Sequence, residues 1–282
     1  MTTVTGRTPP LHAKVQFMVN ASSITKPDYG IDAPGVLRGL LLSGAACLLI
    51  YASLRSHGHT TFDLGPAPNN IHFDIGPMLV GTGTLLLLES FLFLIYVKHG
   101  KFRHRDAILA MHQWTGGEQV LDVGCGRGLL LVGAAKRIAS DTGHANGNGG
   151  HATGIDIWSN VDMGNNSATR THRNIDLEGV ADRCTLVSMP APAMTFPDAT
   201  FDLVVSNLCI HNIAKKADRD QACREIVRVL KPGGQALISD YKNTAAYARV
   251  FLNANCEVSR KWGSWLTTFP PLRTVIVRKA DH

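Results

Sequence analysis

The residues best suited to chemistry lie in one short stretch, VLDVGCGRGLL, at residues 120–130. An apolar run leads to Asp122, glycines follow at Gly124, Gly126 and Gly128, and a helical apolar pattern comes next. Glycine reaches positive φ at little cost and lets a ligand lie against the backbone, beside the positively polarised N-terminus of a helix. The stretch therefore predicts a strand, a tight turn and a helix that together bind a ligand.

Three later segments occur in the order that a doubly wound sheet requires. Asp156 ends the apolar pair of GIDIW at residues 154–158, and a carboxylate at the end of such a strand accepts hydrogen bonds from ribose hydroxyls. The apolar segment at 201–205 is followed by the polar residues Ser206, Asn207, His211 and Asn212. These side chains predict a crevice for a ribose-bearing cofactor. The glycine spacing, G-x-G-x-G, fits a nicotinamide dinucleotide less well than G-x-G-x-x-G would.

Alternating apolar segments predict an α/β fold with a Rossmann-like, doubly wound and mostly parallel seven-stranded sheet. We expect strands at 118–123, 153–157, 183–188, 200–206 and 234–240. Helices are expected at 128–139, 166–178 and 217–229, and Pro232, Gly233 and Gly234 predict a turn before the fifth strand. A short helix and two closing strands complete the prediction.

These ordered motifs closely resemble those of class I S-adenosylmethionine-dependent methyltransferases, over roughly residues 101–279. The resemblance implies S-adenosylmethionine as the methyl donor. It assigns the donor's methionine portion to Asp122 and the turn Gly124, Cys125, Gly126 and Gly128. It also places Asp156 on the ribose hydroxyls, Ile157 on adenine and Asn207 beneath the sulfonium.

The chain departs from that family's pattern at Ser188-Met189-Pro190-Ala191. Many relatives have an acidic residue where Pro190 stands, and they use it to meet the adenine amino group. We expect backbone groups near Met189 and Ala191 to meet adenine instead.

The candidate general base is His211, just after the fourth strand of the predicted sheet. The alternative is a structural histidine in that loop, and Asp240 and Tyr241 rank below it. Methyl transfer from a sulfonium already has an activated leaving group, so alignment of donor and acceptor supplies much of the acceleration. A hydroxyl or protonated amine acceptor still has to lose a proton, whereas a thiolate does not.

Two apolar runs precede this domain, at residues 39–54 and 75–97. They approach the roughly 20 residues that cross a bilayer and predict a transmembrane hairpin. The alternative is a pair of core helices in a soluble lid, which Glu89 favours. We expect three parts: a cytosolic segment 1–34, the hairpin 35–98 and the methyltransferase domain 99–282.

The flank after the second run carries four fixed cations, Lys98, Lys101, Arg103 and Arg105, and two histidines. Cations beside a span favour the cytoplasmic side, so the catalytic domain is predicted to face the cytoplasm and anionic membrane lipids. The first residues lack the apolar core of a cleavable signal peptide. The net charge of +6 does not indicate nucleic acid, because the cations form no stripe interleaved with aromatic residues.

The remaining patterns predict no metal site and no disulfides. His144 and His151 belong to a Gly-, Asn- and His-containing loop at residues 140–151, which favours a flexible insertion over a metal site. Six cysteines without metal spacing suit a reducing compartment, and Cys125 and Cys209 are expected to be small apolar fillers.

The sequence thus predicts a membrane-anchored methyltransferase acting on a hydrophobic or membrane-associated small molecule, such as a quinone, sterol, prenyl or phospholipid-like acceptor. We expect residues 1–34, the cytosolic end of the hairpin and a helix at 103–114 to close the acceptor site. The alternatives are a soluble thiol or amine as acceptor, with the hairpin as a tether, and an inactive cofactor-binding scaffold. The oligomeric state stays open.

Overall fold

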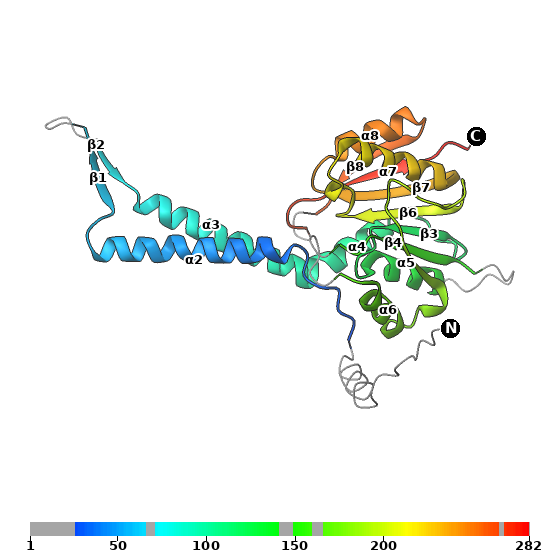
Figure 1. The fold of residues 1–282 in the computed structure, drawn as a ribbon, viewed down its shortest axis with the longest axis horizontal. Helices are drawn as coiled ribbons and strands as arrows, with labels where there is room; N and C mark the ends of the chain where they lie inside the picture. The colour runs from blue at the N-terminus through cyan, green and yellow to red at the C-terminus, as the bar shows by residue number, and fades with distance from the viewer. Residues whose placement is uncertain (1–25, 66–70, 141–148, 160–165, 265–267, 282) are drawn as a thin grey trace, which may run out of the picture.

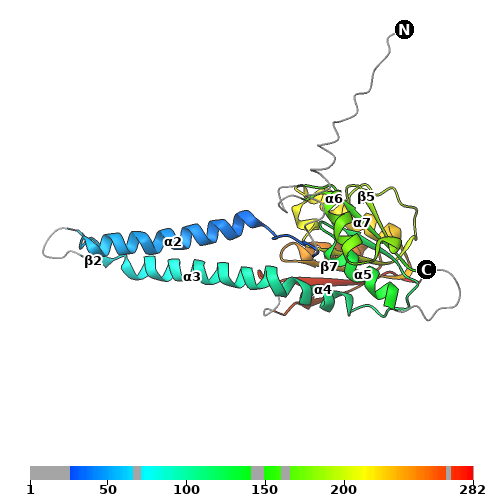
Figure 2. The ribbon, with the colours of Figure 1, turned by 90° about the horizontal axis from the view of Figure 1, so that it is seen from below.

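The computed structural model describes residues 26–65, 71–140, 149–159, 166–264 and 268–281. A domain built on one sheet carries a long two-helix hairpin that projects away from it, as two perpendicular views show (Figures 1 and 2). The hairpin is formed by the N-terminal part of the chain and the sheet domain by the rest.

The sheet has seven strands in the order β5-β4-β3-β6-β7-β9-β8. Strands β3 to β7 are parallel, and β9 lies antiparallel between β7 and β8. Their bounds are β3 Gln119–Val123, β4 His151–Asp156, β5 Cys184–Ser188, β6 Phe201–Asn207, β7 Leu230–Asp240, β8 Glu257–Trp262 and β9 Arg273–Arg278. The predicted fold class is confirmed, and the order changes direction beside β3, where ligands bind in open α/β sheets.

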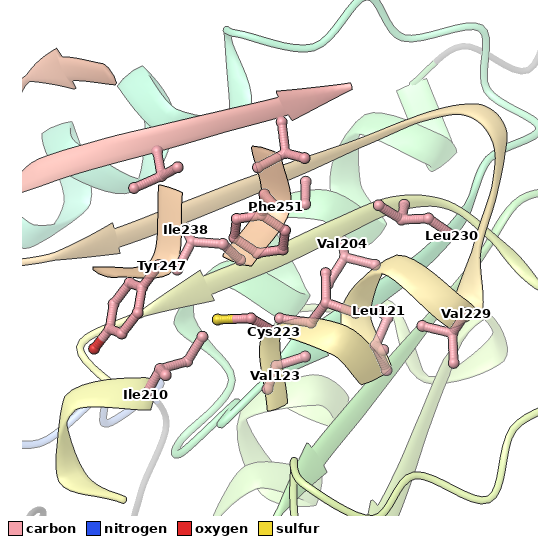
Figure 3. Packing of buried hydrophobic residues seen from close by; sticks show 14 of the residues in the cluster. Leu121, Val123, Val204, Ile210, Cys223, Val229, Leu230, Ile238, Tyr247 and Phe251 are labelled. Carbon is pink, nitrogen blue, oxygen red and sulfur yellow. The ribbon is translucent and has the colours of Figure 1, made fainter. Parts of the chain in front are cut away.

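Helices cover both faces of the sheet (Figure 1). The connecting helices are α5 Leu129–Ser140, α6 Ala168–Leu177, α7 Lys216–Val229 and α8 Thr244–Asn253. Alternate residues of each strand serve opposite faces, so Leu121 and Val204 pack with Phe251 of α8 (Figure 3), whereas Val120 and Leu203 pack on the α5 side. Short 3-10 turns occur at Ala181–Arg183 and Ile210–Asn212.

The hairpin consists of α2 Pro34–Ser56 and α3 Gly76–Ile95, with a ribbon of β1 Thr61–Leu64 and β2 Ile71–Asp74 at its far end. The helices pack closely because glycines lie between them. A Cβ on Gly83 would lie 2.9 Å from Leu48 Cδ2, and a Cβ on Gly44 would lie 3.0 Å from Leu87 Cγ. Small residues of this kind let two apolar helices approach without a hydrophobic core of their own.

The outward faces of the hairpin are apolar and uncovered. Leu42 and Leu49 of α2 are 72% and 71% exposed, and Leu88 and Phe91 of α3 are also exposed. Two core helices of a soluble lid would be mostly buried, whereas 11% and 17% of the most apolar windows of the two helices are buried in the described part of the chain. Glu89 is half-buried.

Helix α3 continues without a break into a π-helical turn, Tyr96–Gly100, and then into α4, Lys101–Leu109. The prediction of a helix at 103–114 was wrong at both ends. The helix ends at Leu109, whose carbonyl accepts hydrogen bonds from the Trp114 indole (2.8 Å) and the His112 amide (3.4 Å).

The predicted turn at Pro232, Gly233 and Gly234 is instead an irregularity within β7. Leu230 already pairs with Phe201, and the register shifts before Gln235 pairs with Leu203. A bulge accommodates the proline and glycines without ending the strand.

Candidate functional site

The glycine turn joins β3 to α5 at the carboxyl edge of the sheet. Gly124, Gly126 and Gly128 have φ values of +73°, +50° and +83°. Residues that carry a side chain rarely adopt such positive values. The amides of Gly124 and Cys125 both donate to the Ile155 carbonyl of β4 (2.8 and 3.0 Å). The turn is therefore held against the next strand by its backbone, as the sequence pattern predicts.

The loop after β6 lies directly on this turn. A Cβ on Gly124 would lie 2.1 Å from the Sγ of Cys209, so glycine is required there by space as well as by φ. Cys125 is buried against Gly154 of β4, where an added Cβ would lie 2.9 Å from its Sγ. Both cysteines pack as small side chains, and all six cysteines are free thiols.

Asp156 lies at the end of β4, facing the turn. Its Oδ2 accepts the Gly126 amide (2.8 Å), and its Oδ1 accepts the Trp158 amide (2.6 Å) and the Asn166 side chain (3.2 Å). Ile157 beside it is 67% exposed, which leaves a branched apolar side chain open at the edge. The carboxylate is thus fixed by three donors, in the place where the family resemblance puts a ribose.

Asp122 is buried at the end of β3. Its Oδ2 accepts the Leu131 amide of α5 (2.9 Å), which satisfies one of the free donors at that helix N-terminus. Burial raises the pKa of Asp122 to about 7, although the Leu131 amide acts in the opposite direction. Its expected contact with the donor's methionine portion stays a prediction.

Met189 and Ala191 follow β5, next to Asp156. The Met189 amide donates to the Asp156 carbonyl (3.1 Å), and the Met189 sulfur accepts the Thr195 amide (3.4 Å). Met189 is buried and Ala191 is half-buried against the same core. The structure therefore brings this segment to the crevice, and its proposed contact with adenine remains a prediction.

Asn207 ends β6 and meets the base of the hairpin. The side chains of Tyr96 in the π-helical turn and His104 in α4 lie close to the Asn207 side chain. His104 Nε2 in turn lies 2.7 Å from the Ser239 hydroxyl of β7, and both are buried. Sequence reasoning missed Tyr96, His104 and Ser239, because no motif connects the apolar helices with strands that lie more than a hundred residues later.

His211 is paired with a carboxylate. Its Nδ1 lies 2.8 Å from Oδ1 of Asp240, and its backbone amide donates to Oδ2 of the same side chain (3.1 Å). Asp240 is buried at the end of β7 and also accepts the Tyr247 hydroxyl (3.3 Å). The centroids of the Tyr241 ring and the His211 imidazole lie 4.7 Å apart, with the rings packed edge to face. His211, Asp240 and Tyr241, which the sequence analysis treats as separate candidates, thus form one cluster.

Residues 28–30 lie over the glycine turn from outside. Asp28 Oδ2 accepts a hydrogen bond from the buried Arg127 (2.6 Å), and the Asp28 backbone exchanges hydrogen bonds with Asn174 of α6. Burial alone would raise the pKa of Asp28. The hydrogen bond from the Gly30 amide and the charge of Arg127 act in the opposite direction and outweigh burial, so the pKa is lowered. We call residues 28–30 the strap.

The strap is also tied to α4. The Lys101 ammonium donates to the Tyr29 carbonyl (2.9 Å) and the Gly30 carbonyl (2.5 Å). Lys101 is buried, so its predicted contact with lipid headgroups is wrong, because it satisfies backbone carbonyls instead. Lys98 and Arg103 of the same flank are exposed.

The described residues fit S-adenosylmethionine. The Oδ1 of Asn166 is buried beside Asp156 and accepts no hydrogen bond within the described ranges, and that of Asn207 accepts none of normal geometry there. Asn166 precedes α6 and contacts Asp156 at the end of β4, and Asn207 ends β6. A ligand with ribose hydroxyls and an ammonium group supplies the missing donors.

Metal ligation finds no support in the described ranges, where no group of three or more His, Cys, Asp or Glu could hold an ion. His151 lies at the start of β4 with its Nε2 2.8 Å from the Thr185 hydroxyl, and His144 lies outside the described residues.

Comparisons with known proteins agree with this geometry. Residues 121–238 match the family model described as a methyltransferase domain. The ubiquinone/menaquinone biosynthesis C-methyltransferase UbiE of Hydrogenovibrio crunogenus is 35% identical over 126 residues, which cover 44% of this chain and 42% of that protein. The sterol 4-C-methyltransferase strm-1 of Caenorhabditis elegans is 30% identical over 128 residues, which cover 45% of this chain and 32% of that protein.

Among solved structures, the [4+2]-cyclase SpnF superposes with a TM-score of 0.50 at 18% identity and covers 64% of this chain and 81% of its own. That likeness shows the fold alone, since one fold serves many reactions. The chain spans about two-fifths of the length of the UbiE relatives it matches. Residues 121–238 are therefore similar to a methyltransferase domain, and the strand order and the glycine turn are consistent with that similarity.

Proposed function

We propose that this protein is an S-adenosylmethionine-dependent methyltransferase anchored in a membrane by α2 and α3, and that its acceptor is a hydrophobic, membrane-associated small molecule. The observation that carries the proposal is the junction between the hairpin and the site. Phe93, Tyr96 and Val97, at the end of α3, pack with Leu37 of α2 and contact Leu208. Leu208 directly follows Asn207, so the apolar hairpin ends beside the cofactor crevice.

The dimensions of the hairpin support the membrane part of the proposal. Helix α2 has 23 residues and α3 has 20, which correspond to about 35 and 30 Å at 1.5 Å per residue. The hydrocarbon core of a bilayer is about 30 Å thick. The exposed cations Lys98 and Arg103 then lie at the domain end of α3, which favours a cytoplasmic domain. The proposed parts remain 1–34, 35–98 and 99–282.

The proposed mechanism assigns separate tasks to the residues of the crevice. S-adenosylmethionine, when bound, supplies a methyl group on a cationic sulfur leaving group. Asp156 and the glycine turn bind the donor and orient it, and the apolar junction excludes water from the acceptor. His211, held by Asp240, accepts the proton of a hydroxyl or ammonium acceptor, and its contact with that carboxylate stabilises the imidazolium that forms.

The names of two relatives are consistent with an apolar acceptor, since one is a ubiquinone/menaquinone biosynthesis C-methyltransferase and the other a sterol 4-C-methyltransferase. Two alternatives make different predictions: a soluble thiol or amine acceptor, with the hairpin as a tether, and a scaffold that binds the cofactor without turnover. The intact glycine turn and Asp156 support cofactor binding, which all three possibilities require, so turnover distinguishes the scaffold.

The full chain in phospholipid vesicles, supplied with methyl-labelled S-adenosylmethionine and cellular lipid or aqueous extracts, separates these possibilities. We expect S-adenosylhomocysteine to form with the lipid extract and the label to enter the organic phase. Asp156→Ala is the control and should lose both signals. Label confined to the aqueous phase would support the soluble acceptor, and cofactor binding without turnover in any extract would support the scaffold.

A further inference from the structure

The ribbon at the far end of the hairpin has one wholly apolar face. In the antiparallel pairing of β1 and β2, Phe62 lies opposite Phe73 and Leu64 lies opposite Ile71. Opposed residues share a face and successive residues alternate, so these four side chains lie together. The other face carries the polar residues Thr61, Asp63, His72 and Asp74.

The apolar face is uncovered by any described part of the chain. Phe62 and Phe73 are each 48% exposed, and Leu64 and Ile71 are 59% and 68% exposed. An isolated two-stranded ribbon is marginally stable in water, and an exposed apolar surface of this kind marks a contact with something else. The polar face has its own partners, since His72 contacts Asp63.

The position of the ribbon indicates what covers it. Helix α3 begins at Gly76, shortly after β2. The Gly76 amide donates a hydrogen bond to the Asp74 carboxylate (2.8 Å). Met78, two residues further along, is 59% exposed, so exposed apolar side chains follow the ribbon into α3. Helices of about 30 Å place the ribbon where the hydrocarbon of the far leaflet ends.

From these observations we infer that the ribbon lies flat in the far leaflet, at the boundary between acyl chains and headgroups, with Phe62, Leu64, Ile71 and Phe73 toward the acyl chains. This inference rests on the proposed membrane anchoring. Both strands have a free edge, and unpaired backbone groups cannot enter the hydrocarbon core, whereas water and headgroups satisfy them at the boundary. An amphipathic surface binds there by burying one face. The ribbon then fixes the depth of the hairpin from the side opposite the catalytic domain.

Tryptophan quenching tests this placement in the full chain, reconstituted in phosphatidylcholine vesicles that contain lipids brominated near the upper end of the acyl chains. Phe73→Trp places the probe on the apolar face, His72→Trp is the matched control on the polar face, and Leu88→Trp reports on the middle of α3. The signal is the difference from the parent protein. We expect the quenched fraction of Phe73→Trp to exceed that of His72→Trp by at least about two-fold.

The three positions distinguish the possible failures. Quenching at residue 88 with equal, weak quenching at residues 72 and 73 would show a spanning hairpin with its ribbon in water, and would overturn this inference alone. A blue-shifted Phe73→Trp emission without quenching would show a protein cover and would also overturn it. No quenching at residue 88 would overturn the membrane anchoring itself. Unchanged S-adenosylhomocysteine affinity shows that each variant is folded, because the ribbon is remote from the crevice.

Discussion

Arg127, the residue between the second and third glycines of the cofactor turn, donates a hydrogen bond to the carboxylate of Asp28 (2.6 Å). Its backbone carbonyl accepts the Asn174 side chain (2.9 Å), which also donates to the Asp28 carbonyl (3.0 Å). A Cβ on Gly30 would lie 2.8 Å from the Arg127 guanidinium carbon, so the strap packs tightly on this side chain. The turn is thus held from one side by β4 and from the other by the strap.

Asp28→Ala is expected to weaken S-adenosylhomocysteine binding about three- to ten-fold, because the turn loses its outer support. Asp28 is 55% exposed, so a modest effect of about 0.7–1.4 kcal/mol is appropriate for its charge-assisted hydrogen bond. Isothermal titration calorimetry measures the affinity, and Asp182→Ala, which removes a similarly exposed acid paired with Arg183, is the control. Equal affinities for the two variants would show that the strap does not position the turn.

Gly124→Ala is expected to lower the free energy of unfolding by more than the roughly 1–2 kcal/mol that a left-handed conformation costs. The excess comes from the clash with Cys209, whose Sγ and Cβ would lie 2.1 and 2.5 Å from the new methyl group. In a Cys209→Gly background the clash is gone and the conformational cost remains. Denaturation of the single and double variants gives the coupling between the two positions. Additive effects would contradict the close approach.

Asp122 is expected to make stability depend on pH. Burial raises the pKa of Asp122 from its ordinary value of 3.8 to about 7, so the folded state binds the proton more tightly. The resulting stability is present below about pH 4 and is lost as pH rises to about 7, at up to about 1.4 kcal/mol per pH unit.

Asp122→Asn should remove this loss, since its amide oxygen still accepts the Leu131 amide. Unfolding of both proteins in detergent, at several pH values between 4 and 8, compares them. Parallel stability profiles would mean that Asp122 is not protonated in the folded protein at neutral pH.

His211→Ala is expected to slow turnover by about 10²–10⁴-fold, the usual contribution of a general base, and to leave S-adenosylhomocysteine affinity unchanged. Asp240→Asn should slow turnover less, because the imidazole stays in place but loses the charge beside Nδ1. His172→Ala, an exposed histidine of α6, is the control. An unchanged rate in His211→Ala would assign that histidine a structural role.

The sheet and the crevice could be predicted because their signals are local. Apolar segments end at Asp122, Asp156 and Asn207, and parallel strands bring such ends to one edge. Every predicted strand appears in the sheet, with ends that shift by a few residues where hydrogen bonding extends beyond the apolar run, as at Leu230.

The sequence predicts residues 1–34 and the cytosolic end of the hairpin beside the acceptor site, but it does not predict their individual contacts, because these join distant parts of the chain. Asp28 and Asn174 are 146 residues apart, and no pattern in either segment indicates the other. Lys101 likewise belongs to a cationic flank by composition, yet its burial depends on where the strap lies. Residues whose neighbours come from tertiary packing carry no local signal of their role.

The unbroken passage from α3 through Tyr96–Gly100 into α4 leaves no flexible linker between the anchor and the catalytic unit. Under the proposed anchoring, the methyl group is therefore presented at a constant height above the lipid surface. Such an enzyme would select acceptors by the distance between their reactive atom and their first apolar carbon. The length of the apolar tail beyond that carbon would not affect selection.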